Sequence, residues 1–215
     1  MNSDISSIKI SAYADEHSSP EDPLLAELVR FTHLHTMHPR MLSGHVQGKL
    51  LELIACMIRP RRILEIGTFT GYSALCLAKG LTDDGVLHSI ERNDELHETA
   101  LSFINRSPRA AQIHLHVGDA LATIPMFDEV FDLVYIDGDK RQYCEYYTLV
   151  FDKLRTGGII LADNVLWDGK IVETLIPSDD QSKGIMSFND LVQNDPRVEN
   201  LLLPLRDGLM IIRKK

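Results

Sequence analysis

Short apolar runs alternate with segments of helical length over most of the chain. The runs that fit buried strands are Ile63–Ile66, Val86–Ile90, Ile113–Val117, Leu133–Ile136 and Ile159–Ala162. The segments that fit helices between them are about Tyr72–Gly80, Asp94–Asn105 and Lys140–Leu154. This alternation is typical of βαβ units, which build a parallel sheet with helices on its faces. The pattern therefore predicts a doubly wound α/β fold.

The two ends of the chain depart from this alternation. Near the C-terminus, Leu201–Leu205 and Leu209–Ile212 are separated only by Arg206-Asp207-Gly208, which is too short for a helical crossover. An otherwise parallel sheet should therefore end in an antiparallel hairpin strand. Before the first strand, leucines spaced three and four apart in Leu24–Phe31 and Leu50–Met57 predict two extra N-terminal helices.

Three stretches carry turn or loop signals. Residues 1–23 are polar and contain Pro20 and Pro23, so we expect an extended or partly mobile arm. Gly157-Gly158 predicts the turn into the last parallel strand, and Trp167–Lys183 is long and polar enough to be a functional loop or lid. We expect one domain over residues 1–215, made of the arm (1–23), the N-terminal helices (24–60) and the Rossmann-like core (61–215).

Composition narrows the class of partner. The 215 residues include 22 Lys and Arg against 31 Asp and Glu, a formal charge of −9, with 44% hydrophobic residues. Such an acidic balance weighs against a protein held mainly by nucleic-acid phosphates or by an anionic membrane. Three scattered cysteines form no CxxC pair, and no apolar run approaches the roughly 18 residues that span a bilayer. We expect a cytoplasmic protein without a membrane partner.

The first predicted strand leads into a glycine-containing turn before a helix. Gly67 and Gly71 permit close backbone approach, and Ser73 lies in the first turn of the helix. The turn lacks the GxGxxG pattern, which weakens a pyrophosphate-binding dehydrogenase interpretation. Glu65, just before the turn, would repel a pyrophosphate and would suit a cationic ligand.

Acidic side chains also follow the next two predicted strands. Glu91 can accept hydrogen bonds from both hydroxyls of a ribose, and Asp119, followed by Ala120, can accept from an adenine amino group. Each acid alone is explained equally well as a helix cap. Three acids at successive strand ends favour a nucleotide site, because ligands of open α/β sheets bind at the carboxyl ends of strands.

Oxygen ligands follow the fourth and fifth strands. Asp137, Asp163 and Asn164 offer two carboxylates and an amide oxygen, which suit Mg²⁺, Mn²⁺ or Ca²⁺. Asp137 alone, or Asp163-Asn164 alone, would fit a charged turn between strand and helix as well as a metal site. Lys140, three residues after Asp137, can serve as a general base at the same edge, or it can simply pair with Asp139.

These motifs together resemble a known family. Two motifs carry the resemblance: the run Glu65–Ser73, and the D-x-x-K-x-x-Y pattern formed by Asp137, Lys140 and Tyr143. Both resemble motifs of the class I, metal-dependent O-methyltransferases that use S-adenosylmethionine (SAM). Caffeoyl-CoA and catechol O-methyltransferases typify this family, and the chain resembles its bacterial members. The resemblance extends from about Met41 to the end and implies a Rossmann-like fold. The implied cofactor-binding residues are Ser43, Glu65, Gly67, Ser73, Glu91, Asp119, Ala120 and Asp137. The implied metal ligands are Asp137, Asp163 and Asn164, and the implied catalytic residues are Lys140 and Asp137.

The resemblance also implies a reaction, while the acceptor stays open. The expected acceptor is a vicinal dihydroxy aromatic molecule such as a catechol or a hydroxycinnamoyl thioester, and the expected assembly is a homodimer. A tRNA hydroxyuridine methyltransferase is the alternative: the net charge weighs against it, but Arg59–Arg62 could form a local basic patch. An NAD-dependent oxidoreductase lacks its phosphate-binding glycines here, and a non-catalytic nucleotide-binding module would not need Lys140 and the metal ligands.

Overall fold

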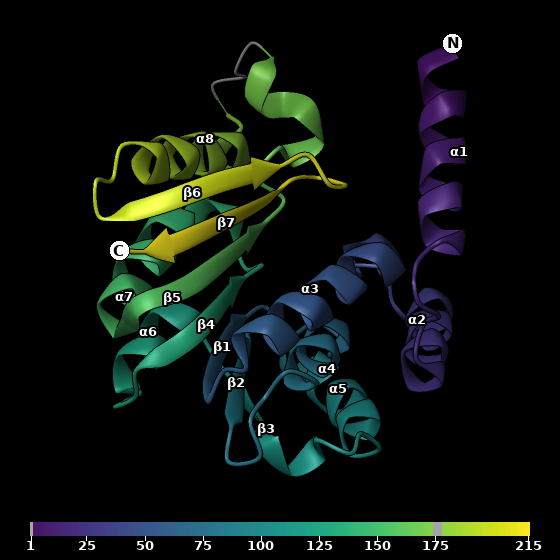
Figure 1. Ribbon diagram of the computed structural model, residues 1–215, viewed down its shortest axis with the longest axis horizontal. Helices are drawn as coiled ribbons and strands as arrows, with labels where there is room; N and C mark the ends of the chain where they lie inside the picture. Colours follow the sequence, from purple (N-terminus) through teal and green to yellow (C-terminus); the bar gives the residue numbers. More distant parts are fainter. Residues whose placement is uncertain (1, 174–177) are drawn as a thin grey trace.

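A seven-stranded sheet organises the protein, in the order β3-β2-β1-β4-β5-β7-β6 (Figure 1). The computed structural model describes residues 2–173 and 178–215, with side chains from residue 9 onward. The strands are β1 (Arg62–Ile66), β2 (Val86–Glu91), β3 (Ile113–Val117), β4 (Phe131–Ile136), β5 (Leu154–Asp163), β6 (Val198–Leu203) and β7 (Leu209–Lys214). The α-helices are α1 (Asn2–Glu16), α2 (Pro23–His35), α3 (His45–Ile58), α4 (Tyr72–Ala78), α5 (His97–Ile104), α6 (Ala120–Thr123), α7 (Tyr143–Lys153) and α8 (Asp180–Gln193).

The strand order confirms the predicted doubly wound fold. Strands β1 to β5 pair in parallel, whereas β7 runs antiparallel to both β5 and β6. From β1 the chain moves outward to β2 and β3, then returns to build β4 and β5 on the other side. The order of strands thus reverses between β1 and β4. Ligands of open α/β sheets bind at such a switch point, beyond the carboxyl ends of the strands.

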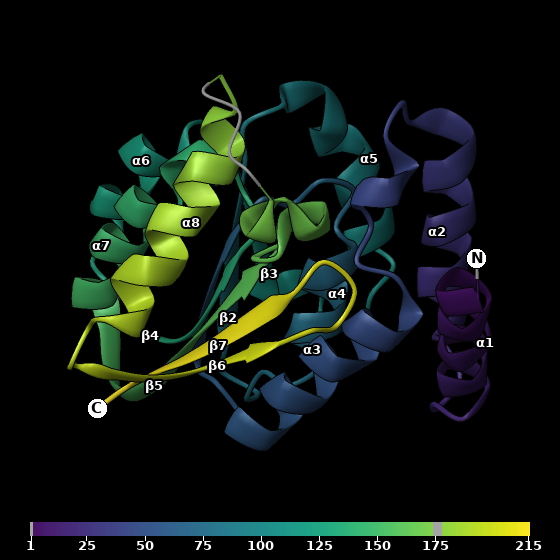
Figure 2. The ribbon, with the colours of Figure 1, turned by 90° about the horizontal axis from the view of Figure 1, so that it is seen from above.

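Helices cover both faces of the sheet, so that the sheet separates two layers of hydrophobic core (Figure 2). Helices α2 to α5 pack on one face through buried residues such as Leu25, Leu51 and Leu75. Helices α7 and α8 pack on the other face through residues such as Tyr147 and Phe188. Because both faces of the central strands are buried, the strands have the nearly continuous apolar character seen in the sequence.

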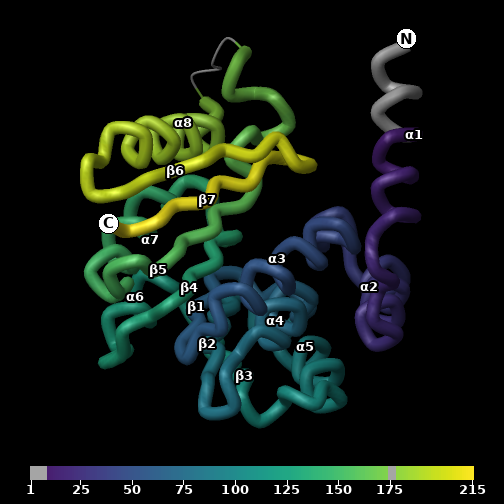
Figure 3. The backbone as a smooth tube through the Cα atoms, viewed as in Figure 1, coloured from purple at the N-terminus to yellow at the C-terminus, as the bar shows by residue number. Residues whose placement is uncertain are grey.

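Residues 1–23 were predicted to form an extended or partly mobile arm; the extended conformation is wrong for Asn2–Glu16, which forms the helix α1. The described part of this helix lies apart from the sheet (Figures 1 and 3), while its last turn contacts α3 through Asp15 Oδ1 and His45 Nδ1, which are 2.7 Å apart. Its sequence contains neither proline nor glycine, so nothing interrupts a helix. Among its described side chains, from residue 9 onward, Ile10 and Tyr13 are 68% and 62% exposed, so this part of the helix buries no apolar stripe that a periodic pattern would report.

Two smaller expectations also differ from the structure. Gly157 and Gly158 lie inside β5, which begins at Leu154, rather than in a turn before it. Gly157 has φ +76°, and the register with β4 is irregular at this point, so the glycines accommodate an irregularity in the strand. The expected loop 167–183 contains a 3₁₀ segment (Trp167–Val172) and the start of α8, while residues 174–177 lie outside the described residues.

A group of histidines joins the edge strand β3 to β2. His88 Nδ1 lies 2.9 Å from His116 Nε2, and His88 Nε2 lies 2.8 Å from a carboxylate oxygen of Glu129. The other oxygen of Glu129 accepts from Arg62 Nε at 2.8 Å, and the His114 ring lies 5.6 Å from that of His88. Burial lowers the pKa of both His88 and His116.

We expect this pair to make the fold sensitive to acid. A histidine whose pKa is lower in the folded state contributes stability that is fully present above its unfolded pKa of about 6.5 and is lost as the pH falls below that value. His116→Gln keeps a hydrogen-bonding side chain without the titration. Urea unfolding at pH 7 and pH 5 should show a smaller loss of unfolding free energy in this variant than in the wild type. Equal losses would assign the acid sensitivity to other groups.

Candidate active site

A cleft with both polar and apolar lining residues lies at the switch point between β1 and β4. Four elements line it: the segment before α3, the turn after β1, the start of α4, and the end of β4. The lining residues are Met41, Leu42, Ser43, Gly67, Thr68, Phe69, Tyr72, Ser73 and Asp137. Four of the residues predicted from the sequence, Ser43, Gly67, Ser73 and Asp137, therefore meet in one place.

A second, larger hollow on the outer surface of α6 and α7 is not the candidate site. Its lining is largely apolar and consists of Leu121, Cys144, Glu145, Thr148 and Leu149. None of the residues predicted to bind or react lies in it. A binding site for a polar cofactor needs several converging polar groups, and those are found at the switch point.

Gly67 allows the ends of β1 and β4 to come together. Its φ is +99°, and a Cβ atom at this position would lie 2.3 Å from the carbonyl oxygen of Asp137. On either side, Asp137 N donates to Ile66 O at 2.8 Å, and Gly67 N donates to Ile90 O at 2.9 Å. Gly67 is predicted from the sequence to admit a ligand, and the structure shows that it must also admit the neighbouring strand.

Glu65 is a buried carboxylate with an unused oxygen. Its side chain is fully buried; Ser89 Oγ donates to Oε2, while Oε1 has no hydrogen-bond partner among the described residues. Burial raises the pKa of Glu65 to about 8, and hydrogen bonds from Ser73 and Ser89 partly oppose that rise. A cation beside Oε1 would offset the desolvation of the carboxylate, as predicted for the positively charged end of SAM.

The three residues predicted to hold the ribose and the adenine lie at the ends of β2 and β3. Glu91 accepts from Phe69 N at 2.7 Å and from Asn93 N at 2.8 Å, so its carboxylate is fixed beside the β1 turn. Asp119 caps α6 by accepting a hydrogen bond from Leu121 N at 2.8 Å. Ala120, the first residue of that helix, is buried. The helix-cap interpretation thus holds for Asp119, and contact with the nucleoside stays a prediction for all three.

The predicted metal ligands come together where β4 and β5 end. Ile136 pairs with Ala162 in the parallel register, so Asp137 and Asp163 follow at adjacent positions. Asp163 is 4% exposed, and the next residue, Asn164, has φ +57°. No hydrogen bond ties the Asn164 side chain to any residue that the structure describes.

These three side chains fit a hard divalent cation by their chemistry. Burial raises the pKa of Asp137 to about 6; the neighbouring Asp163 adds to this rise, while Lys140 opposes it. A divalent cation between the two carboxylates would relieve their repulsion, and the amide oxygen is a further hard ligand. Within the described part of the chain, no three Asp, Glu, His or Cys side chains are placed to hold a metal ion, so the fit depends on Asn164 as a third ligand.

Hydrogen bonds through Lys140 and Tyr143 connect the Asp137 carboxylate to the backbone of Asp163. Lys140 Nζ donates to Asp137 Oδ1 at 2.7 Å and to the hydroxyl of Tyr143 at 2.7 Å, and that hydroxyl donates to the Asp163 carbonyl oxygen at 2.9 Å. The side chain of Lys140 is 8% exposed. The alternative pairing with Asp139 is wrong, because Arg141 binds that carboxylate.

Backbone strain is concentrated around the same cleft. Among the described residues, six other than glycine have a positive φ, and five of them surround the two strand ends: Phe69, Asn164, Trp167, Asp168 and Arg206. Each such conformation costs on the order of 1–3 kcal/mol and persists only where the surrounding structure holds it in place. The side chain of Arg206 donates to the carbonyl of Leu42 at 2.9 Å, which ties the β6–β7 loop to the segment before α3.

A buried polar row, which was not predicted from the sequence, crosses the central strands. Ser89, Glu65 and Tyr135 occupy the same register on β2, β1 and β4, under α3 and α4. From α3, Gln47 Nε2 donates to Asp163 Oδ2 at 2.5 Å, and the Tyr135 hydroxyl donates to the same oxygen at 2.8 Å. The signal that could have found this row is a polar residue at matching positions of otherwise apolar strands.

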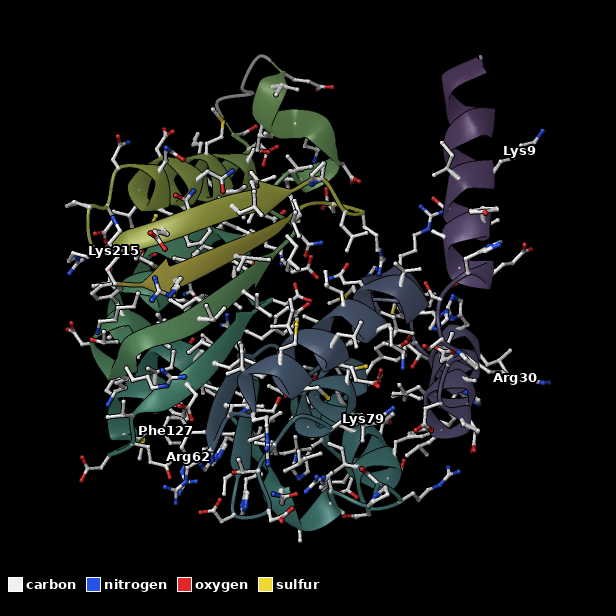
Figure 4. The ribbon with its side chains drawn as sticks, in the orientation of Figure 1. Lys9, Arg30, Arg62, Lys79, Phe127 and Lys215 are labelled. Atoms are coloured by element: carbon white, nitrogen blue, oxygen red, sulfur yellow. The ribbon has the colours of Figure 1, made fainter. Side chains whose placement is uncertain are left out.

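The arginines at residues 59–62 lie at the opposite end of β1 from the cleft; Arg62 is at the lower edge of the molecule in Figure 4. Arg61 pairs with Asp84 at 2.6 Å, and Arg62 pairs with Glu129 at 2.8 Å. Their charges are thus partly offset by acidic neighbours. This arrangement weakens the basic patch that a tRNA substrate would require.

Comparisons with known proteins agree with this architecture. A family model described as O-methyltransferase matches residues 15–215. A caffeoyl-CoA O-methyltransferase of Zinnia elegans is 31% identical over 213 residues, covering 91% of this chain and 84% of the relative. Caffeoyl-CoA O-methyltransferase 5 of Nicotiana tabacum is 30% identical over 209 residues, covering 91% and 86%.

Solved structures give the same result. The O-methyltransferase TomG of Streptomyces achromogenes, crystallised with SAM, superposes with a TM-score of 0.90 at 30% identity and 96% coverage of both chains. An O-methyltransferase of Bacillus cereus, in complex with S-adenosylhomocysteine (SAH), has a TM-score of 0.88 at 28% identity, covering 96% of this chain and 97% of that one. The present chain therefore belongs to the O-methyltransferase family and is a SAM-dependent O-methyltransferase of the caffeoyl-CoA type.

Proposed function

We propose that the protein methylates one hydroxyl of a catechol-like acceptor, in a reaction that depends on Mg²⁺ or a similar cation (Mn²⁺ or Ca²⁺). The observation that carries this proposal is a hydrogen-bonded network in which the candidate base Lys140 contacts the Asp137 carboxylate and, through the Tyr143 hydroxyl, is linked to the backbone carbonyl of Asp163. A vicinal diol offers two adjacent oxygens to a cation, whereas a single hydroxyl offers one. A hydroxycinnamoyl thioester would satisfy the same chemistry.

In this proposal, each part of the cleft has a separate task. Glu65, with its unused oxygen, faces the ammonium end of SAM, and Glu91 faces the ribose. Asp137, Asp163 and Asn164 hold the cation, which supplies Lewis-acid charge at the acceptor oxygens when bound. Lys140 takes the proton of the reacting hydroxyl; the oxygen then forms a bond to the methyl carbon as the carbon–sulfur bond breaks, leaving a methyl ether and SAH. The fixed hydrogen bonds of Lys140 hold it in position for this step.

Trp167 supports an aromatic acceptor. Its ring lies 6.0 Å from Lys140 Nζ, and its indole Nε1 has no hydrogen-bond partner among the described residues although it is buried. An aromatic wall with a free donor beside the candidate base suits a ring that carries hydroxyl groups.

The test is a methyl-transfer screen with and without EDTA. Catechols, hydroxycinnamoyl thioesters and undermodified tRNA are offered with SAM, and the formation of SAH is measured. We expect EDTA-sensitive transfer to at least one diol, restored by excess Mg²⁺. Transfer only to tRNA, weakened by salt, would establish the tRNA alternative, and transfer unaffected by EDTA would contradict the metal requirement.

The assembly and the location of the protein stay predictions. The homodimer follows only from the family resemblance, and light scattering of the purified protein can test it. None of the described helices combines the length and the apolar character needed to cross a bilayer.

A further inference from the structure

The carboxylate of Asp163 is held asymmetrically. Its Oδ2 accepts two hydrogen bonds, from Gln47 Nε2 at 2.5 Å and from the Tyr135 hydroxyl at 2.8 Å. Its Oδ1 accepts one hydrogen bond, from the backbone N–H of Asn164 at 2.8 Å. A carboxylate offers about four lone-pair sites over its two oxygens, so two donors use the capacity of Oδ2 while Oδ1 keeps an unused site.

The two donors to Oδ2 come from different layers of the fold. Tyr135 lies near the carboxyl end of β4 and is fully buried, whereas Gln47 lies in the first turn of α3 and is 2% exposed. Gln47 Nε2 also lies 3.5 Å from the Tyr135 hydroxyl, so the three side chains form one compact group. If the carboxylate rotated away, two buried donors would lose their acceptor, which is unfavourable.

We propose that Gln47 and Tyr135 are positioning residues that fix Asp163 so that Oδ1 is the oxygen presented to the divalent cation. This inference rests on the proposed function, because it assumes that Asp163 is a metal ligand. Groups that hydrogen-bond to a metal-binding carboxylate typically alter metal affinity by about 10–100-fold. Through Gln47, helix α3 also connects this ligand to the segment that carries Ser43, where SAM is proposed to bind.

A purely structural role for the same hydrogen bonds predicts a different outcome. If Tyr135 and Gln47 only satisfied a buried carboxylate, their loss would lower thermal stability without a selective effect on metal binding. Tyr147 provides a matched control, because it is buried and its hydroxyl donates to Asp195 Oδ2 at 2.8 Å, in a Tyr–Asp pair between α7 and the end of α8. Tyr147→Phe removes the same kind of hydrogen bond away from the cleft.

The experiment measures Mn²⁺ binding by the electron paramagnetic resonance signal of free Mn²⁺, in the presence of saturating SAH. Wild type, Tyr135→Phe, Gln47→Met and Tyr147→Phe are compared, with SAH affinity measured by calorimetry and thermal stability by circular dichroism. We expect Tyr135→Phe and Gln47→Met each to weaken Mn²⁺ binding by about 10-fold or more. Their SAH affinity should stay within about twofold of the wild type, and Tyr147→Phe should leave both affinities unchanged.

The outcomes separate this inference from the proposed function. If the wild type binds Mn²⁺ and both substitutions near Asp163 leave its affinity unchanged, the positioning inference is wrong while the metal proposal stands. The same holds if Tyr147→Phe weakens Mn²⁺ binding as much as Tyr135→Phe does, because the effect would then follow stability alone. If the wild type takes up no Mn²⁺, both the metal proposal and the positioning inference fail.

Discussion

Asp163→Ala should reduce methyl transfer by more than about 100-fold, because loss of a metal ligand should exceed the 10–100-fold typical for loss of an outer partner. The substitution removes one of the two carboxylates at the strand ends. Binding of SAM should change little, because Asp163 does not line the cleft at the β1 turn. The measurements are the rate of SAH formation with a catechol and Mg²⁺, and the affinity for SAM by calorimetry.

A second variant separates the charge of Asp163 from its part in the fold. Alanine also leaves Gln47 and Tyr135 without their acceptor, which costs about 1–3 kcal/mol for each buried donor. Asp163→Asn keeps an acceptor oxygen of similar shape but removes the negative charge. We expect this variant to approach the thermal stability of the wild type and still to transfer methyl groups very slowly. Turnover close to that of the wild type in Asp163→Asn would contradict the role of this carboxylate as a metal ligand.

Sequence patterns predicted some parts of this site and not others, because they report on residues close together in the chain and not on contacts between distant ones. Periodicity and short motifs are local, so they predicted the strands, the glycine turn and the acids at strand ends, all of which depend on neighbouring residues. Gly67 was predicted for a close approach, but its contact with Asp137 joins positions 70 residues apart in the chain, which no local pattern reports. The same holds for Gln47 and Asp163, whose contact depends on how α3 crosses the sheet.

The N-terminal helix shows the opposite limit. Residues 1–23 lacked an apolar period and were therefore predicted to be an extended or partly mobile arm, yet Asn2–Glu16 is helical. Periodicity reports burial against a neighbour and not the helical state itself. A helix that stands away from the core gives no such signal, whereas the buried faces of α3 and α7 gave clear ones.

Lys140→Met should lower the turnover number by about 10²–10⁴-fold, the range expected for loss of a positioned general base. The methionine has a similar length and would occupy the space of the lysine stem, so the buried surroundings formed by Tyr143 and Trp167 should persist. The effect should lie mainly in kcat, because Lys140 is proposed to act on the reacting proton. Initial rates over a range of acceptor concentrations, at saturating SAM, separate kcat from KM.

Lys140→Arg distinguishes a base from a simple positive charge. Arginine can restore the charge beside Asp137 and its hydrogen bonds, but its guanidinium stays protonated and therefore cannot take the proton of the acceptor hydroxyl. If Lys140 is the base, the arginine variant should be as slow as the methionine variant while binding SAM normally. If arginine restores most of the turnover, the ammonium of Lys140 acts by its charge and its contacts with Asp137 and Tyr143, and the proton must leave by another route.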